Sequence, residues 1–81
     1  MDYYVYIIYS ESKDTYYKGI TNNSKRRLYE HNSKSNSGYT KSGKPWVETL
    51  VIKKPNKDKA YLLEKKLKNL NRKRLEDFIE K

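Results

Sequence analysis

The alternation of apolar and polar stretches divides the chain into six predicted elements, of which the first two form a hairpin. Tyr3–Tyr9 and Thr15–Thr21 are rich in aromatic and β-branched residues, and the polar segment Ser10–Asp14 separates them. Such residues are enriched in strands, and a short polar segment between two strands is typical of a turn. Residues 3–21 therefore predict an antiparallel β-hairpin.

The signals of a first helix follow the hairpin. Asn22 and Asn23 are both suited to cap a helix over about Ser24–Ser33, because an asparagine side chain accepts hydrogen bonds from the free N–H groups of a first turn. The segment carries few apolar residues beyond Leu28 and Tyr29. Only a narrow stripe of this helix can therefore be buried.

The second half of the chain predicts one more strand and two more helices. Trp46–Lys53 is largely apolar and predicts a third strand, whereas apolar residues from Lys57 to Leu70 recur at helical spacings of three and four. Asn71 is a suitable cap for a closing helix. The apolar positions of the two helices are Ala60, Leu63, Leu67 and Leu70, then Leu75, Phe78 and Ile79. The predicted fold is α+β, a small antiparallel three-stranded sheet flanked by helices in the order ββαβαα.

Composition is compatible with one small folded domain over residues 1–81. A chain of 81 residues has a large surface for its volume and leaves only a modest core. Hydrophobic residues make up 35% of the sequence, but nine tyrosines and the periodic apolar stretches favour a folded chain over a disordered one. The sequence has no cysteine, which excludes disulfide bonds, thiolate zinc sites and cysteine nucleophiles.

The charge of the chain indicates a polyanionic partner. Nineteen Lys and Arg against ten Asp and Glu give a formal net charge of +9, which is a large positive field for a small protein. The sequence contains neither a lipidation signal nor an apolar segment near the roughly 20 residues that span a bilayer. Its start lacks the pattern of a secretory signal. We therefore expect a cytoplasmic protein that binds nucleic acid and not membranes.

Strand and helix periodicity brings several chemically active side chains together. Alternate residues of a strand share one face of the sheet, so Tyr6 and Tyr17 are expected side by side on one face of the hairpin. Arg27 and His31 are four residues apart and project from the same face of the first helix. Glu64 lies at the edge of the apolar stripe of the second helix, where its carboxylate can face the sheet.

The order of these residues resembles the GIY-YIG nuclease family. The resemblance rests on Tyr4-Val5-Tyr6, Tyr17-Lys18-Gly19, Arg27, His31 and the helical Glu64, and it covers nearly the whole chain. More narrowly, the chain resembles the short stand-alone bacterial members, whose biological role is mostly unassigned. The family includes homing endonucleases, some restriction enzymes and the incision subunit of bacterial excision repair. The resemblance thus implies a metal-dependent endonuclease that hydrolyses phosphodiester bonds in DNA, in a setting such as DNA repair or recombination.

The resemblance also implies a role for each residue. Glu64 would hold one divalent cation, Mg²⁺ or Mn²⁺, which keeps much of its hydration and stabilises the leaving oxygen. Arg27 would neutralise charge on the phosphate, while Tyr6 and Tyr17 position and activate the attacking water. Reference pKa values are about 10 for tyrosine and about 6.5 for histidine. A base role therefore needs either a tyrosine pKa lowered by nearby cations or proton relay through His31, and we favour the tyrosine–histidine pair.

Three positions depart from the family pattern. Tyr4 stands where the family name has glycine, and Lys18 stands where the second motif usually has an apolar residue, but neither change removes a reacting group. In some members a lysine directly after the glycine of the second motif assists the base. This chain has Ile20 there, so that assistance is absent or replaced. Strand alternation turns Lys18 away from Tyr17, which makes it a poor substitute.

Contacts to nucleic acid are expected from basic residues, from the second motif and from a loop. Ser33–Pro45 is rich in Ser, Asn, Gly and Lys, contains Tyr39 and predicts a mobile cationic loop that closes over a backbone. We expect a monomer that needs no small-molecule cofactor. The residues assigned to nucleic-acid contacts are Lys18, Gly19, Lys25, Arg26, Lys41 and Lys44.

A simpler interpretation exists for each candidate residue. Tyrosine is a favoured strand residue, so the tyrosines can be ordinary packing residues. Arg27 can be solvated helix surface, and His31 near a helix C-terminus can interact with the helix dipole. Glu64 can pair with Lys68 at a spacing of four, which contributes only about 0.2 to 0.5 kcal/mol.

Two other classes of function also remain open. The chain can be a nucleic-acid-binding module that has the fold without the catalysis. Glu64→Gln separates this class from a nuclease, because binding should survive and cleavage should vanish. The chain can also be a small interaction protein whose charge keeps it soluble, and such a protein should show no salt-dependent binding to polynucleotides.

Overall fold

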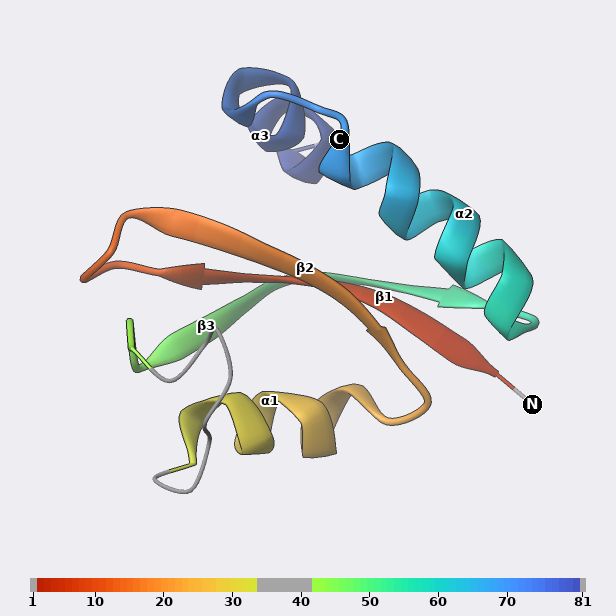
Figure 1. The fold of residues 1–81 in the computed structure, drawn as a ribbon, viewed down its shortest axis with the longest axis horizontal. Coiled ribbons are helices and arrows are strands. Elements are labelled where there is room, and N and C mark those ends of the chain that lie inside the picture. Colours follow the sequence, from red (N-terminus) through yellow and green to blue (C-terminus); the bar gives the residue numbers. More distant parts are fainter. Residues whose placement is uncertain (1, 34–41, 81) are drawn as a thin grey trace.

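The computed structural model describes residues 2–33 and 42–80, and they form six elements (Figure 1). The elements are β1 (Tyr3–Ser10), β2 (Thr15–Thr21), α1 (Ser24–Asn32), β3 (Trp46–Lys54), α2 (Lys57–Lys68) and α3 (Arg72–Glu80). This confirms the predicted order ββαβαα. Of the predicted loop Ser33–Pro45, residues 34–41, which include Tyr39 and Lys41, lie outside the described residues. No helix within the described ranges is long and apolar enough to cross a membrane.

The helix boundaries follow from local hydrogen bonds. The side chains of Asn23, Asn56 and Asn71 each accept a hydrogen bond from the backbone N–H three residues later, at 2.9 to 3.0 Å. Asn23, rather than Asn22, therefore caps α1. The α2 helix ends two residues before the predicted Leu70. Its last turn tightens because the N–H groups of Asn69 and Leu70 bond to carbonyls only three residues earlier.

The sheet is antiparallel throughout, and its strand order is β2-β1-β3. Tyr6 in the central strand is opposite Gly19 of β2 and Val51 of β3. The pairing of β1 with β3 shifts between Ile7 and Ile8, where the Thr49 hydroxyl donates a hydrogen bond of 2.8 Å to the Ile7 carbonyl. The register puts alternate residues of β1 on opposite faces of the sheet.

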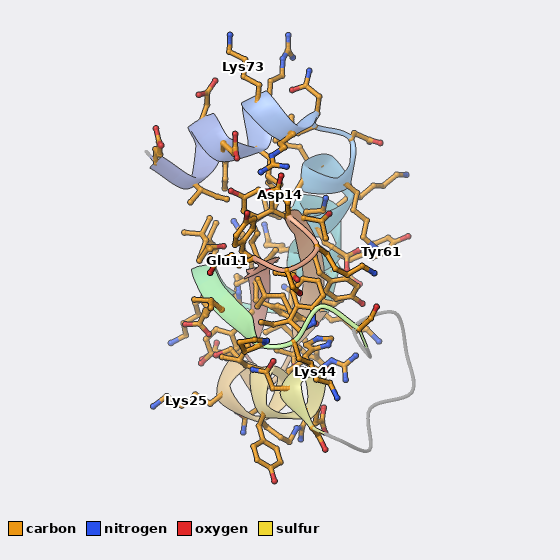
Figure 2. All side chains as sticks on the ribbon, turned by 90° about the vertical axis from the view of Figure 1, so that its left-hand side faces the viewer. Glu11, Asp14, Lys25, Lys44, Tyr61 and Lys73 are labelled. Carbon is orange, nitrogen blue, oxygen red and sulfur yellow. The ribbon has the colours of Figure 1, made fainter. Side chains whose placement is uncertain are left out.

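Helices cover both faces of this sheet. Figure 1 shows α2 and α3 on one face and α1 on the other. The same three layers appear in the turned view of Figure 2, where Lys73 of α3 and Lys25 of α1 lie at opposite ends and the hairpin turn with Asp14 lies between them. The fold is therefore an α+β sandwich with the sheet as its middle layer.

Each face has its own apolar core. The larger core joins Val5 and Ile7 of β1 to the apolar stripe of α2 and to Leu75 of α3. The smaller core contains Tyr6, Ile8 and Trp46, with partly buried neighbours Tyr17, Leu28 and Val51. The smaller core thus contains two of the candidate catalytic tyrosines.

Candidate active site

Tyr6 lies at the centre of the candidate site. Its side chain is only 3% exposed, and its hydroxyl is 2.8 Å from Nε2 of His31, within hydrogen-bond distance. The ring covers Gly19, its partner in the register, and a Cβ atom at Gly19 would lie 2.4 Å from the Tyr6 hydroxyl oxygen. Since real Cβ atoms do not approach so closely, the position of the phenol depends on the glycine.

Tyr17 joins the same cluster from β2. It pairs with Ile8 and so lies diagonally from Tyr6, with the two ring centres 6.4 Å apart. The Tyr17 ring also lies edge-on to His31, at 5.1 Å, and to Trp46, at 6.3 Å. The two tyrosines predicted to share a face do so, and both rings meet the imidazole.

The first helix supplies Arg27 and His31 to this cluster. They are one helical turn apart, and both interact with Tyr6: His31 at the hydroxyl, and Arg27 through a side-chain hydrogen bond. An Nη atom of Arg27 also lies 3.1 Å from Oε1 of Glu30, which holds the guanidinium from its solvent side. His31 is 2% exposed, so it is a buried group rather than a surface residue at a helix end.

Burial decides the protonation states at the site. It raises the pKa of Tyr6 to about 12, although the hydrogen bond and the positive charge of Arg27 act in the opposite direction. Burial, followed by the charge of Arg27, lowers the pKa of His31 to about 4. Both groups are therefore neutral near pH 7. The option of a Tyr6 pKa lowered by nearby cations is not what the structure shows, because desolvation outweighs the guanidinium.

Glu64 belongs to the layer of helices on the opposite face of the sheet from α1. It belongs to α2, its side chain is 13% exposed, and its Oε1 lies 3.5 Å from Nζ of Lys68. Its charge nevertheless contributes to the raised pKa of Tyr6, after burial and the charge of Tyr17. The ion pair with Lys68 that the simpler interpretation requires is also present.

The donor groups near the cluster suit a cation that retains water. Among the described residues, no group of three or more His, Cys, Asp and Glu side chains is arranged to hold a metal ion. Glu64 is a single, largely buried carboxylate whose contact with Lys68 is a loose 3.5 Å. Mg²⁺ is commonly bound by one or two carboxylates together with water and substrate phosphates. Glu64 fits such an ion, whereas the site does not fit a cage made of protein ligands alone.

The residues assigned to nucleic-acid contacts have different surroundings. Lys25 and Arg26 are exposed on α1, and Arg26 is engaged by Asn22. Lys44 is half-buried and donates a hydrogen bond to the Ser33 carbonyl. Gly19 is buried beneath Tyr6, so its assignment as a contact residue is not supported, because its role there is to leave space.

Lys18 lies on the opposite face of β2 from Tyr17, as strand alternation predicts, and it is half-buried. Burial and the neighbouring charge of Lys68 lower the pKa of Lys18. Lys41 belongs to the segment outside the described residues. The structure thus puts Lys25 and Arg26 on the α1 surface, Lys18 at the β2 edge, and Lys44 just before β3 beside the end of α1.

Two residues that support the site were not singled out from the sequence. Trp46 is 2% exposed and packs against Tyr17. Its backbone N–H donates to Oδ1 of Asn32 at 2.6 Å, and its carbonyl accepts from Nδ2 of Asn32 at 3.1 Å. Asn32 therefore joins the end of α1 to the start of β3. The one available signal was that the only tryptophan of the chain begins a strand.

Comparisons with known proteins match nearly the whole chain. The family model described as the GIY-YIG catalytic domain matches residues 2–77. A UPF0213 protein of Bacillus cereus is 36% identical over 70 residues, which cover 86% of this chain and 73% of that protein. A UPF0213 protein of Halalkalibacterium halodurans is 32% identical over 80 residues, covering 98% of this chain and 83% of the relative. A solution NMR structure of a UPF0213 protein from Bacillus halodurans superposes with a TM-score of 0.65 and 29% identity, covering 99% of this chain and 84% of that one.

Proposed function

The chain belongs to the GIY-YIG family, and on this premise we propose that it is an endonuclease that hydrolyses phosphodiester bonds in DNA with a divalent metal ion. The observation that carries the proposal is the buried cluster in which the Tyr6 hydroxyl contacts His31 and Arg27 while Tyr17 packs against the imidazole. Buried groups with strongly shifted pKa values, such as Tyr6 and His31, are found most often at functional sites. DNA repair or recombination is the setting we propose for the activity.

Arg27 supplies positive charge to the phosphate. The guanidinium is fixed from two sides, by Tyr6 and by Glu30, so its orientation is set before substrate binds. A preorganised cation of this kind stabilises charge that develops on the phosphate oxygens in the transition state. Its other contact, with the Tyr6 hydroxyl, places the phosphate next to the group that orients the attacking water.

Tyr6 and His31 accept the proton that the attacking water loses. Because the pKa of Tyr6 is raised to about 12 and that of His31 is lowered to about 4, the resting pair is a neutral phenol and a neutral imidazole. When Nδ1 of His31 carries the ring proton, Nε2 accepts the hydroxyl proton of Tyr6. As the hydroxyl proton of Tyr6 passes to Nε2 of His31, the Tyr6 oxygen takes up a proton from the attacking water, so that the phenol stays neutral and the imidazole becomes protonated. A bound phosphate adds negative charge, which raises the pKa of His31 and favours this transfer.

Glu64 is the residue that would hold the metal. Its single carboxylate, whose charge acts on Tyr6 and which is mostly shielded from solvent, leaves the remaining coordination positions to water and phosphate oxygens. When bound, a divalent ion supplies electrostatic stabilisation of the leaving oxygen. Nζ of Lys68 lies 3.5 Å from Oε1 of this carboxylate, so a metal ion would share Glu64 with a neighbouring cation.

Substrate choice should be loose. The exposed cations of α1 and the net charge of +9 favour DNA phosphates, which position a protein on DNA without reading its sequence. We therefore propose weak binding with little sequence discrimination, and modest activity for the domain by itself.

Cleavage of labelled single-stranded, duplex and branched DNA at low salt tests the proposal. The wild type is compared with Glu64→Gln and Tyr17→Phe in the presence of Mg²⁺, Mn²⁺ or a chelator. We expect cutting that needs the metal and is lost in both variants, while DNA binding survives in Glu64→Gln. Equal binding by all three proteins with no cleavage of any substrate would refute the nuclease and leave a nucleic-acid-binding module.

A further inference from the structure

A second charged surface adjoins the candidate active site along the outer edge of β2. A hollow of about 240 Å³ lies there, lined by Tyr16, Tyr17, Lys18 and Lys68. Tyr17 belongs to the catalytic cluster, where its ring packs against His31. The hollow therefore shares Tyr17 with the candidate site.

Two lysines give this hollow its charge. Lys18 enters from β2 and Lys68 from the last turn of α2, and they are near enough for the charge of Lys68 to help lower the pKa of Lys18, after burial. Within the part of the chain that the structure describes, Lys18 has no ion-pair partner. Two cations that repel each other across an open hollow form a favourable place for an anion, which would interact with both.

Lys68 also ties the hollow to the metal-binding carboxylate. Its Nζ atom lies 3.5 Å from Oε1 of Glu64 and its side chain is 55% exposed, so it borders Glu64 on one side and solvent on the other. An anion held by Lys68 would therefore lie next to, and not at, the position of the metal.

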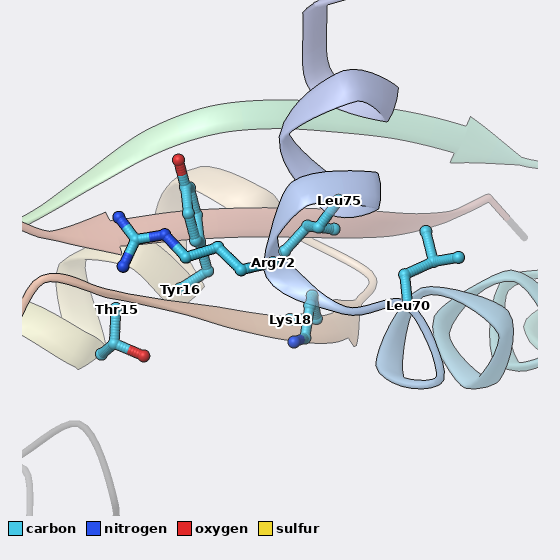
Figure 3. Close-up of a pocket in the computed structure, with 6 residues that line it drawn as sticks. All are labelled: Thr15, Tyr16, Lys18, Leu70, Arg72 and Leu75. Atoms are coloured by element: carbon cyan, nitrogen blue, oxygen red, sulfur yellow. The ribbon is translucent and has the colours of Figure 1, made fainter.

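The neighbouring hollow on the same edge has a different character. It measures about 130 Å³, and Figure 3 shows Lys18 between Tyr16 and Leu70, with Arg72 extending over Tyr16. Arg72 is paired with Asp14 at 2.7 Å and with Glu76 at 3.2 Å, so its charge is compensated. Lys68 is paired with Glu64 at 3.5 Å, so Lys18, which lines both hollows, is the cation of this edge that has no ion-pair partner in the described ranges.

We propose that Lys18 and Lys68 bind a DNA backbone phosphate adjacent to the one that is cut, and so position the strand along β2. The proposal rests on the proposed function in taking DNA as the ligand. Lys68 is a positioning residue in this scheme, since it acts on the neighbouring phosphate and on the orientation of Glu64. The strand then runs from the α1 cations across Tyr17 to the end of α2.

Binding of a labelled single-stranded oligonucleotide in chelator tests this assignment without any need for cleavage. Lys68→Gln and Lys18→Gln should each bind roughly five- to tenfold more weakly at about 0.1 M salt, and each should reduce the slope of log K against log salt by about 0.7, the effect of one lost phosphate contact. Lys68→Arg, which keeps the charge, should bind like the wild type.

Lys66→Gln is the matched control. It removes the same charge from the same helix, but Lys66 lies two residues from Lys68, about 200° around the helix, and lines a hollow against α3. It should change binding less than about twofold, as expected for a charge that touches no phosphate.

The outcomes separate this inference from the proposed function. Equal effects of Lys68→Gln and Lys66→Gln would overturn the subsite, and so would a loss in Lys68→Gln that Lys68→Arg does not restore. If the variants behave as expected but no DNA is ever cut, the subsite stands and the nuclease fails. If DNA is cut and the variants do not differ, the nuclease stands and the subsite fails.

Discussion

At the scale of single residues, the site depends on a missing side chain. Gly19 leaves the space that the Tyr6 phenol occupies, and Tyr6 in turn contacts His31 and Arg27. Strand alternation was enough to predict from the sequence that Tyr6 and Tyr17 share a face. The role of Gly19 and the raised pKa of Tyr6 could not be predicted, because both depend on how closely side chains from different elements pack.

Gly19→Ala should disturb the site through a clash with Tyr6. A Cβ atom would lie 2.4 Å from the hydroxyl oxygen and 2.6 Å from the ring carbon that carries it. Overpacking of this kind costs about 1 to 3 kcal/mol of stability, and alanine recovers roughly 0.5 to 1 kcal/mol because glycine is unfavourable in a strand. Urea denaturation should show a net loss, and cleavage should fall. In a Tyr6→Leu background the same substitution should cost less, whereas equal costs in both backgrounds would rule out the clash.

His31 should make stability depend on pH in a defined window. The native pKa of about 4 is below the usual 6.5, so the unfolded chain binds a proton more readily than the native one between these values. Stability from this residue is therefore complete above about pH 6.5 and falls as the pH drops toward 4. Between pH 7 and pH 5 the wild type should lose about 2 kcal/mol more than His31→Gln. Parallel pH profiles for the two proteins in denaturant titrations would contradict the buried, neutral imidazole.

At the scale of elements, the site is assembled where α1, β3 and the edge of β2 meet. Periodicity predicted each of these elements, because amphipathic spacing is a local property of the sequence. Periodicity did not predict how these elements are joined. Asn32 and Trp46 are 14 residues apart, and the side chain of Asn32 forms hydrogen bonds with the backbone of Trp46. The sequence indicated only that Lys68 pairs with Glu64 on the helix surface. The hollow that Lys68 lines with β2 forms only when α2 packs on the sheet.

Asn32→Ala should loosen the junction of α1 with β3. The substitution removes both hydrogen bonds to the Trp46 backbone, at a cost of about 1 to 3 kcal/mol for groups left without partners. The fluorescence of Trp46, the only tryptophan, should report the change together with the urea midpoint. Asn32→Asp keeps the acceptor for the Trp46 N–H and should cost less than alanine. If these hydrogen bonds do not stabilise the fold, the Trp46 fluorescence spectrum and the urea midpoint of both variants will match those of the wild type.

At the scale of the whole molecule, a small protein carries a net charge of +9, and its ion pairs are not spread evenly over the surface. Several carboxylates are engaged with cations away from the cluster, as in the network of Asp14 and Glu76 with Arg72. Cations of α1 and of the β2 edge flank the candidate site, where Glu30 and Glu64 pair with some of them. Net charge predicted a polyanionic partner from composition alone, but only the folded arrangement shows where the partner would lie.

This arrangement predicts binding to DNA that weakens steeply with salt. Even two phosphate contacts reduce affinity about tenfold between roughly 50 and 200 mM salt, because bound counterions are released on association. Anisotropy of a labelled oligonucleotide across that range measures the effect. A protein whose charge serves only solubility would show no salt-dependent binding, and a flat titration would remove nucleic acid as the partner.

The dependence of the cleavage rate on Mg²⁺ tests the central claim most directly. Single-turnover cleavage of a labelled DNA is followed across a Mg²⁺ series for the wild type, Glu64→Gln and Glu80→Gln, the last removing an exposed carboxylate at the end of α3. We expect saturable activation of the wild type and of Glu80→Gln, and a rate at least about a hundredfold lower in Glu64→Gln with DNA binding retained. Cleavage by Glu64→Gln at the wild-type rate, with the same response to Mg²⁺, would contradict the account.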